Sequence, residues 1–356
     1  MLEFRRHLDY LQEHTSAFIN SENFGNTFEY WLSLLAKMTV KQGVAFYTPR
    51  SLVNLLIDIT KPREGMSIYD PTVGTGGMLI GAAHYIRQHG GNLESTQFYG
   101  REKLQDIWAI CNMNILAHQI DNATIEHGDS LRDMEARTDT FDLVLQNIPL
   151  SLDPGNRTKT NQMTQAFLEH AVESLSPSGS AAILAPASIL QQDHQDFWHQ
   201  ILQRDWLEAV INLPPKLLHG TNTSAVVFIF NKKKPAGRSS QVLFIRVPSN
   251  FLPHAWHNEL QNVDIQSIVQ AFESWGETSQ FTRVIHISEI KDQNYNLSIE
   301  RYPDFGEITQ PFDIASALNR YHIASQKREA AVTRLMQNLA ELDYPIKPSQ
   351  DKPSLQ

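Results

Sequence analysis

The chain contains little cysteine, no long apolar run and no recognisable metal-ligand spacing. Its one cysteine among 356 residues, Cys111, cannot form an internal disulfide, which excludes a disulfide scaffold and favours a cytoplasmic location. The longest apolar stretches, 181–187 and 225–230, have the length of strands, so we expect no membrane partner. The 14 histidines show no pairing such as His-Glu-x-x-His, so we expect no metal site.

Acidic residues outnumber basic ones. The chain has 39 Asp and Glu against 30 Lys and Arg, a net charge of −9 with neutral histidine. This balance excludes a protein that binds nucleic acid across its whole surface, because nucleic acid is itself a polyanion. Any contact with nucleic acid is therefore local or supplied by a partner.

Apolar runs of strand length alternate with helical patterns between residues 65 and 231. Helical segments such as 77–88 and 104–119 follow most of the runs. The alternation predicts an α/β fold with a mostly parallel, doubly wound, seven-stranded sheet and helices on both faces. The seven runs are 66–70, 96–100, 123–127, 141–146, 180–185, 208–213 and 224–230.

We expect the chain to divide into five parts. The C-terminal extension carries two more strand-like runs, 241–247 and 282–288, and the long helix after it is amphipathic. That helix packs on its own domain or docks on a partner. The parts are a helical N-terminal segment at 1–60, a Rossmann-like core at 61–235, a C-terminal α/β extension at 236–310, the long helix at 311–343 and a disordered tail at 344–356.

A glycine-rich turn ends the first strand and opens the next helix. Residues 70–77 are Asp-Pro-Thr-Val-Gly-Thr-Gly-Gly. The glycines let a backbone approach a ligand closely, and the spacing matches neither a dinucleotide fingerprint nor a phosphate loop. Asp70 would repel a pyrophosphate but could bind an ammonium group, which favours S-adenosylmethionine. A purely structural turn is the alternative.

Two carboxylates follow the next two strands. Glu102 comes just after the second strand, where doubly wound folds place a carboxylate that binds ribose hydroxyls. Asp129 follows the third strand, in position to accept from an adenine amino group. Each carboxylate alone could be a solvated loop charge, but together with Asp70 they mark three successive strand ends.

These motifs resemble the methyltransferase subunit of type I restriction-modification systems, and the resemblance runs from about residue 25 to residue 305. The ordered set of segments is more specific than any one of them. The segments are Gly43 with Phe46-Tyr47-Thr48-Pro49, the 70–77 turn, Gly100-x-Glu102, His127-Gly128-Asp129-Ser130-Leu131, Phe167-Leu168-x-His170, Leu175-Ser176-Pro177-x-Gly179, Pro186, Leu213-Pro214-x-Lys216-Leu217, Gly220-Thr221, Tyr295-Asn296-Leu297 and Arg301-Tyr302.

The resemblance implies a class I methyltransferase that uses S-adenosylmethionine to modify the exocyclic amino group of adenine in double-stranded DNA, with the adenine flipped out. It also implies a DNA-specificity subunit as partner, with a second copy of this chain and a nuclease subunit as further partners. The residues expected to bind the cofactor are Tyr47, Thr48, Pro49, Asp70, Pro71, Gly74, Thr75, Gly76, Glu102, Asp129 and Ser130.

The expected catalytic motif departs from the family pattern. The family carries Asn-Pro-Pro followed by Phe or Tyr, whereas this chain has Asn147-Ile148-Pro149-Leu150. Asn147 and the Ile148 carbonyl can still accept hydrogen bonds from the target amino group. Ile148 lacks the fixed φ of proline, and Leu150 cannot stack on a base, a loss of about 1–3 kcal/mol. Weakened transfer, or a scaffold that binds cofactor without transferring, is therefore the alternative.

Two basic segments lie near the expected site. Lys232, Lys233, Lys234 and Arg238 follow the seventh strand, where a solvated turn is the favoured interpretation and phosphate contact the alternative. The polar loop 151–162 is expected either to approach DNA or to be an ordinary surface loop. A dinucleotide-dependent oxidoreductase is a third functional class, disfavoured by the glycine spacing.

Overall fold

The computed structural model describes residues 22–38, 47–132, 138–149, 157–190, 195–218, 224–247, 259–275, 281–302, 322, 325–326 and 329–334. The chain forms two compact units, Met1–Gly306 and Glu307–Gln356. In the second unit, the described residues 329–334 are helical, and the rest of the helix expected at 311–343 lies almost wholly outside the described residues.

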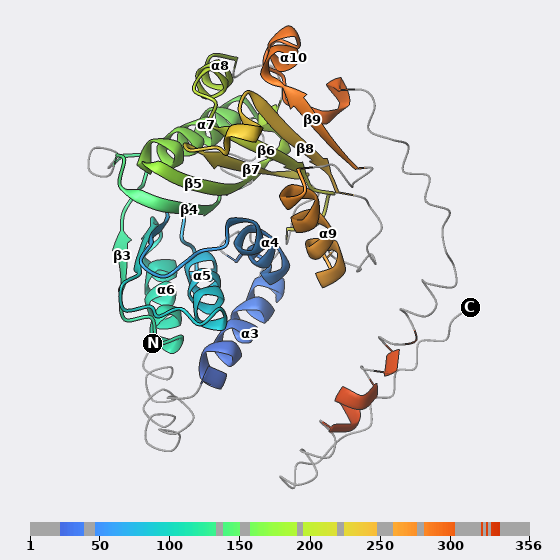
Figure 1. Cartoon of the computed structure of the whole chain (residues 1–356). Coiled ribbons are helices and arrows are strands. Elements are labelled where there is room, and N and C mark those ends of the chain that lie inside the picture. The colour runs from blue at the N-terminus through green and yellow to red at the C-terminus, as the bar shows by residue number, and fades with distance from the viewer. Residues whose placement is uncertain are drawn as a thin grey trace, which may run out of the picture. The chain divides into compact units, whose positions relative to one another are not determined.

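The first unit is an α/β structure built around one twisted sheet (Figure 1). Its elements in chain order are α3 (Glu22–Met38), α4 (Arg50–Thr60), β1 (Ser67–Asp70), α5 (Gly77–Gln88), β2 (Gln97–Glu102), α6 (Gln105–Ala117), β3 (Ala123–His127), β4 (Phe141–Asn147), α7 (Arg157–Ser174), β5 (Leu175–Pro186), η3 (Ala187–Leu190), α8 (Gln195–Gln203), β6 (Leu207–Asn212), β7 (Ala225–Asn231), η5 (Ala236–Arg238), β8 (Gln241–Arg246), α9 (Asn262–Glu273), β9 (Thr282–His286), α10 (Ile287–Asp292) and η6 (Ile299–Arg301).

The α/β class and the helices on both faces are confirmed, but the expected seven-stranded sheet is wrong. The sheet has nine strands in the order β3-β2-β1-β4-β5-β7-β6-β8-β9. The two strands of the expected C-terminal extension continue it, because β8 pairs parallel with β6 and β9 pairs antiparallel with β8. The physical reason is that β8 is apolar on both faces and needs a place in a sheet that is covered on both sides. Pairing with the open edge of β6 gives it that place, with one hydrophobic cluster on each face. Since β7 also runs antiparallel to β5 and β6, the sheet is mixed.

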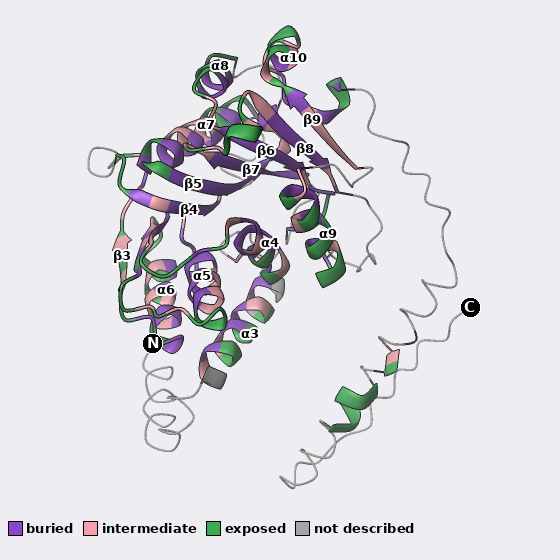
Figure 2. Cartoon of the chain, in the orientation of Figure 1, coloured by how far each residue is buried: buried purple, intermediate pink, exposed green. Residues whose placement is uncertain are grey.

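Two hydrophobic clusters cover the two faces of the sheet. One combines inward side chains of α4, α5, α6 and α9 with one face of the strands, and the other combines those of α7, α8 and α10 with the opposite face. The central strands are buried on both sides, which explains their nearly continuous apolar sequences (Figure 2).

The strand order reverses at β1 and β4, and a doubly wound fold has its ligand crevice at the carboxyl ends of the strands at such a point. The chain moves outward from β1 through β2 to β3, then returns to place β4 on the other side of β1. All of these strands are parallel, so their carboxyl ends lie at one edge of the sheet. Doubly wound sheets bind ligands at such a reversal point.

Candidate active site

The turn after β1 holds a buried carboxyl group and two glycines in left-handed conformations. Asp70 is 2% exposed, and its Oδ1 accepts the backbone N–H of Thr72 at 2.9 Å. Gly74 has φ 53° and Gly76 has φ 90°, a region that side chains with a Cβ rarely adopt. A Cβ at Gly76 would also lie 3.2 Å from Cys111 Sγ. The turn is therefore closed tightly against α6.

This turn makes hydrogen bonds to the ends of β2, β3 and β4. The Gly74 N–H donates to Glu102 Oε2 at 3.1 Å, and Ser130 Oγ donates to the Pro71 carbonyl at 2.5 Å. Thr72 Oγ1 donates to the Asn147 carbonyl at 3.0 Å. The 70–77 turn is thus joined to the predicted site residues of three other strand ends.

Two further hydrogen bonds orient the turn and the Glu102 carboxylate that contacts it. Asn114 of α6 donates its Nδ2 to the Thr75 carbonyl at 2.8 Å. The second oxygen of Glu102, Oε1, accepts the N–H of Leu104 at 2.8 Å, so backbone donors on two sides hold this carboxylate across the turn. A carboxylate oxygen can accept more than one hydrogen bond, so Glu102 can still accept from ligand hydroxyls.

Asn147 lies at the carboxyl end of β4, and its side chain forms a hydrogen bond in addition to that of its backbone carbonyl. Its Nδ2 donates to Thr48 Oγ1 at 2.9 Å. Its Oδ1 is buried and has no hydrogen-bond partner among the described residues. A buried acceptor without a partner costs about 1–3 kcal/mol, so this oxygen is suited to a donor supplied by a ligand.

The electrostatics of the crevice favour a cation. The pKa of Asp70 is raised to about 8, mainly by burial and also by the nearby negative charge of Glu102, against the lowering effect of the hydrogen bonds from Thr72. A positive group placed against these two carboxyl groups would relieve both effects. The ammonium and sulfonium of S-adenosylmethionine are such groups, so the residues present fit this cofactor.

The Asp129 carboxylate forms an ion pair and a hydrogen bond with neighbouring residues. Its Oδ2 forms an ion pair with Lys103 Nζ at 3.0 Å, and its Oδ1 accepts the N–H of Leu131 at 3.1 Å. Burial raises the pKa of Asp129, but the Lys103 and Leu131 hydrogen bonds outweigh it and the net pKa is lowered. Among the described residues its carboxylate bonds to Lys103, Arg132 and Leu131 and not to the 70–77 turn, so its role toward the cofactor stays a prediction.

The other residues of the Asn-Ile-Pro-Leu motif differ in placement. The Ile148 side chain is fully buried in the cluster beneath α7, so only its backbone can serve the crevice. Pro149 is half-buried. Leu150 and residues 151–156 lie outside the described residues, whereas residues 157–162, expected to belong to a loop, form the first turns of α7.

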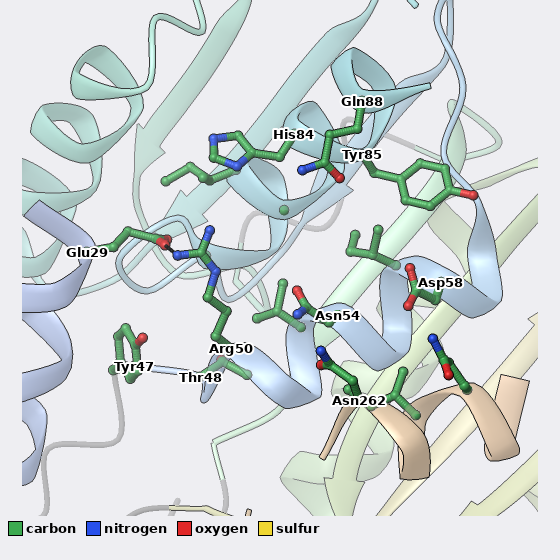
Figure 3. Close-up of a pocket in the computed structure, with 17 residues that line it drawn as sticks. Glu29, Tyr47, Thr48, Arg50, Asn54, Asp58, His84, Tyr85, Gln88 and Asn262 are labelled. Atoms are coloured by element: carbon green, nitrogen blue, oxygen red, sulfur yellow. Dashed lines mark ion pairs between the residues drawn. The ribbon is translucent and has the colours of Figure 1, made fainter. Parts of the chain in front are cut away.

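A cavity of about 360 Å³ meets the 70–77 turn at its last residue, Gly77. Tyr47 and Thr48 line it, but Asp70, Glu102 and Asp129 do not. Figure 3 shows that its walls come from α3, α4, α5 and α9, with Glu29 and Arg50 joined by an ion pair of 3.1 Å at one end. Pro49 occupies the N-cap position of α4, and Thr48 just before it both lines this cavity and accepts the hydrogen bond from Asn147.

The basic residues after β7 are mostly structural. Lys234 Nζ contacts Asp205 Oδ1 at 2.6 Å and the Gln241 carbonyl at 2.7 Å, and its side chain is 3% exposed. Lys232 pairs with Asp139 and Arg238 with Glu208, whereas Lys233 is exposed. Phosphate contact therefore has little support at this turn.

One residue of the site had no role assigned from the sequence. Thr72 was visible within the 70–77 turn, but its partner, Asn147, is 75 residues away. The sequence shows that a hydroxyl side chain lies between Asp70 and the glycines of the turn. No sequence pattern indicates that this hydroxyl donates to the carbonyl of Asn147. Within the described ranges, no group of three His, Cys, Asp or Glu side chains could hold a metal, and no helix is long and apolar enough to cross a bilayer.

Known proteins resemble this chain in sequence along most of its length. The chain is 25% identical over 344 residues to the type I restriction enzyme MjaVII methylase subunit of Methanocaldococcus jannaschii, covering 89% of this chain and 59% of that protein. It is 28% identical over 353 residues to the HindI methylase subunit of Haemophilus influenzae, covering 90% and 78%. This chain thus spans only about three-fifths of the first relative.

The fold also matches a solved structure. The type I restriction-modification system methyltransferase subunit from Streptococcus thermophilus superposes with a TM-score of 0.67 at 24% identity, covering 79% of this chain and 63% of that one. The sequence pattern of the N-6 DNA Methylase family matches residues 20–310. Because that match covers most of the chain, this protein belongs to the N-6 DNA Methylase family.

Proposed function

We propose that this chain transfers a methyl group from S-adenosylmethionine to the exocyclic amino group of adenine in DNA, as the modification subunit of a type I-like restriction system. The observation that carries the proposal is the turn after β1. Its hydrogen bonds to Glu102, Ser130 and Asn147 bring the expected cofactor-binding and target-binding residues to one crevice.

The cofactor would lie along the 70–77 turn. The Asp70 carboxylate would accept hydrogen bonds from the ammonium group of its methionine part, and the Glu102 carboxylate would accept them from its ribose hydroxyls. Gly74 and Gly76 would let the backbone approach it, with Thr48 and Pro49 covering it from the start of α4. The cofactor supplies a methyl group on a sulfonium sulfur, which is already activated for transfer.

The target base would lie against Asn147. The Asn147 Oδ1 and the Ile148 carbonyl would accept hydrogen bonds from the amino group of an adenine flipped out of the duplex. Both bonds direct the nitrogen lone pair toward the methyl group. Catalysis is then mainly by positioning, and no strong general base is required.

The proposed partners follow from the relatives and from charge. The relatives are methylase subunits of type I restriction enzymes. A chain of net charge −9 is poorly suited to holding DNA alone, so a DNA-specificity subunit would supply most of the phosphate contacts. A second copy of this chain and a nuclease subunit would complete the complex.

The proposal is tested in the organism that encodes the chain. Deletion of the gene is expected to remove N6-methyladenine from one recognition sequence, as read by genome-wide methylation mapping. Complementation with Asn147→Ala should fail to restore it. The matched control Asn112→Ala removes a hydrogen bond within α6, from Nδ2 to the Trp108 carbonyl, and should restore methylation fully.

Two results would contradict the proposal. An unchanged adenine methylation map after deletion would exclude the activity. Full restoration by Asn147→Ala would exclude the assigned role of Asn147. Calorimetric titration of the purified chain with S-adenosylmethionine, compared with NAD, tests the cofactor separately. A scaffold without transfer is supported neither by the relatives nor by the free Asn147 acceptor.

A further inference from the structure

Asn147 forms hydrogen bonds with two threonine side chains that are distant from it in the sequence. Thr72 Oγ1 donates to its backbone carbonyl at 3.0 Å across 75 residues. Its side-chain Nδ2 donates to Thr48 Oγ1 at 2.9 Å across 99 residues. One hydroxyl therefore holds the backbone of Asn147 and another holds its amide.

The orientation of that amide decides whether it can bind an amino group. The amide has an acceptor end and a donor end of similar size. With Nδ2 bonded to Thr48, the buried Oδ1 has no partner among the described residues and can accept. Rotation of the amide by half a turn would present Nδ2 instead, and a donor cannot bind the N–H groups of an adenine.

The two hydroxyl groups join Asn147 to two different segments, the 70–77 turn and the start of α4. Thr72 belongs to that turn, and its backbone N–H donates to the Asp70 carboxylate at 2.9 Å. Thr48 immediately precedes Pro49, which caps α4. A shift of either segment would therefore move the carbonyl or the amide of Asn147.

We propose that Thr72 and Thr48 are positioning residues for Asn147. The Thr72 hydroxyl holds its backbone and the Thr48 hydroxyl holds its side-chain amide in the arrangement in which Oδ1 faces the amino group of the target base. This inference rests on the proposed methyl transfer. Neither hydroxyl needs to touch the base. Their effect is on the geometry of the one side chain that does.

Valine substitution removes each hydroxyl while keeping the shape of the side chain. The enzyme would be the complex that an affinity tag on this chain recovers from its own organism, acting on genomic DNA from the deletion strain. Thr72→Val is expected to lower kcat about ten- to hundred-fold, the range that misplacement of a reacting group produces, with KM for S-adenosylmethionine within about three-fold. Thr48→Val should lower kcat similarly.

Serine variants and a remote threonine separate positioning from folding. Thr72→Ser and Thr48→Ser keep the hydroxyl and should regain most of the lost kcat. Thr60→Val removes a comparable bond at the end of α4, from Oγ1 to the Leu56 carbonyl at 2.8 Å, and should leave kcat unchanged. Transfer by Thr72→Val or Thr48→Val equal to that by Thr60→Val would overturn the proposal.

A readout independent of transfer keeps the inference distinct from the proposed function. If the wild-type complex transfers no methyl group, the function fails, and the side-chain amide signal of Asn147 in a nitrogen-15 NMR spectrum still reports on positioning. That signal should shift and broaden in Thr48→Val but not in Thr60→Val. An identical signal in Thr48→Val and wild type would overturn the positioning role even if wild-type transfer is rapid.

Discussion

The backbone N–H of Ile148 donates to the carbonyl oxygen of Leu184 at 2.8 Å, which continues the pairing of β4 with β5 past Asn147. Proline has no N–H and could not make this bond. The isoleucine that replaces the first proline of the Asn-Pro-Pro pattern is therefore a strand-pairing residue in this chain. Its side chain is fully buried as well.

Ile148→Pro is expected to destabilise the fold instead of simply restoring the family motif. It leaves the buried Leu184 carbonyl without its donor, which costs about 1–3 kcal/mol in free energy of unfolding. Ile148→Val keeps the N–H and should cost only about 0.5–1.5 kcal/mol. Urea unfolding monitored by circular dichroism measures both. A proline variant as stable as the valine variant would show that the Leu184 bond is dispensable.

Gly100→Ala is expected to displace the cofactor-binding turn. A Cβ at this position of β2 would lie 2.8 Å from Val73 Cγ2 and 2.9 Å from Ile125 Cδ1. Such overpacking typically costs about 1–3 kcal/mol, and here part of the strain falls on the turn itself. Calorimetric titration should show weaker binding of S-adenosylmethionine.

The double variant Gly100→Ala with Val73→Ala provides the control for that substitution. It removes the Val73 methyl groups that the new Cβ would meet and should recover part of the lost affinity. If Gly100→Ala binds the cofactor like wild type, the turn does not depend on this close approach.

Asp70 should give the stability of the free protein a distinctive pH dependence. Its pKa is about 8 in the folded protein, mainly through burial, against about 3.9 in an unfolded chain. Between these values the folded protein holds a proton that the unfolded chain has lost. The contribution of this carboxyl group to the free energy of unfolding is therefore fully present below about pH 4. It falls as the pH rises toward 8, by up to about 1.4 kcal/mol per pH unit.

Asp70→Asn removes that titration and should flatten the profile. Urea unfolding at pH 5, 6 and 7, with and without the substitution, measures the difference in slope. Parallel profiles would contradict a raised pKa at Asp70. Binding of the ammonium group to the ionised carboxylate should also release a proton below pH 8, which calorimetry in two buffers of different ionisation enthalpy detects.

Neighbouring lysines after β7 should behave differently on substitution. Lys234→Met removes the ion-pair partner of Asp205 and the donor to the Gln241 carbonyl. Asp205 is partly exposed and keeps its hydrogen bonds from Ser239 and Ser240, so the expected cost in free energy of unfolding is about 1–3 kcal/mol. Lys233 is exposed, so Lys233→Met should change the free energy of unfolding by less than about 0.5 kcal/mol. Thermal unfolding compares the two. A marked fall in DNA affinity with Lys233→Met would restore the phosphate-contact alternative.

The position of most strands was predictable from the sequence because each is a local apolar run. The runs at 66–70, 123–127 and 141–146 correspond to β1, β3 and β4, and the helical pattern at 77–88 matches α5. The number of strands in the sheet was not predictable, because β8 joins it by pairing with β6, and β9 joins it by pairing with β8. Edge pairing depends on which backbone groups remain open after the other strands have assembled.

The sequence by itself determined the α/β alternation and the glycine turn with its aspartate, because strand periodicity and left-handed backbone conformations are properties of short segments. Only the tertiary structure decided that Thr72 and Thr48 meet at Asn147, that Lys234 is an internal ion-pair partner, and that Ile148 pairs with Leu184. Each of these contacts joins segments far apart in the chain. Their distances depend on how the strands and helices pack, which no local pattern contains.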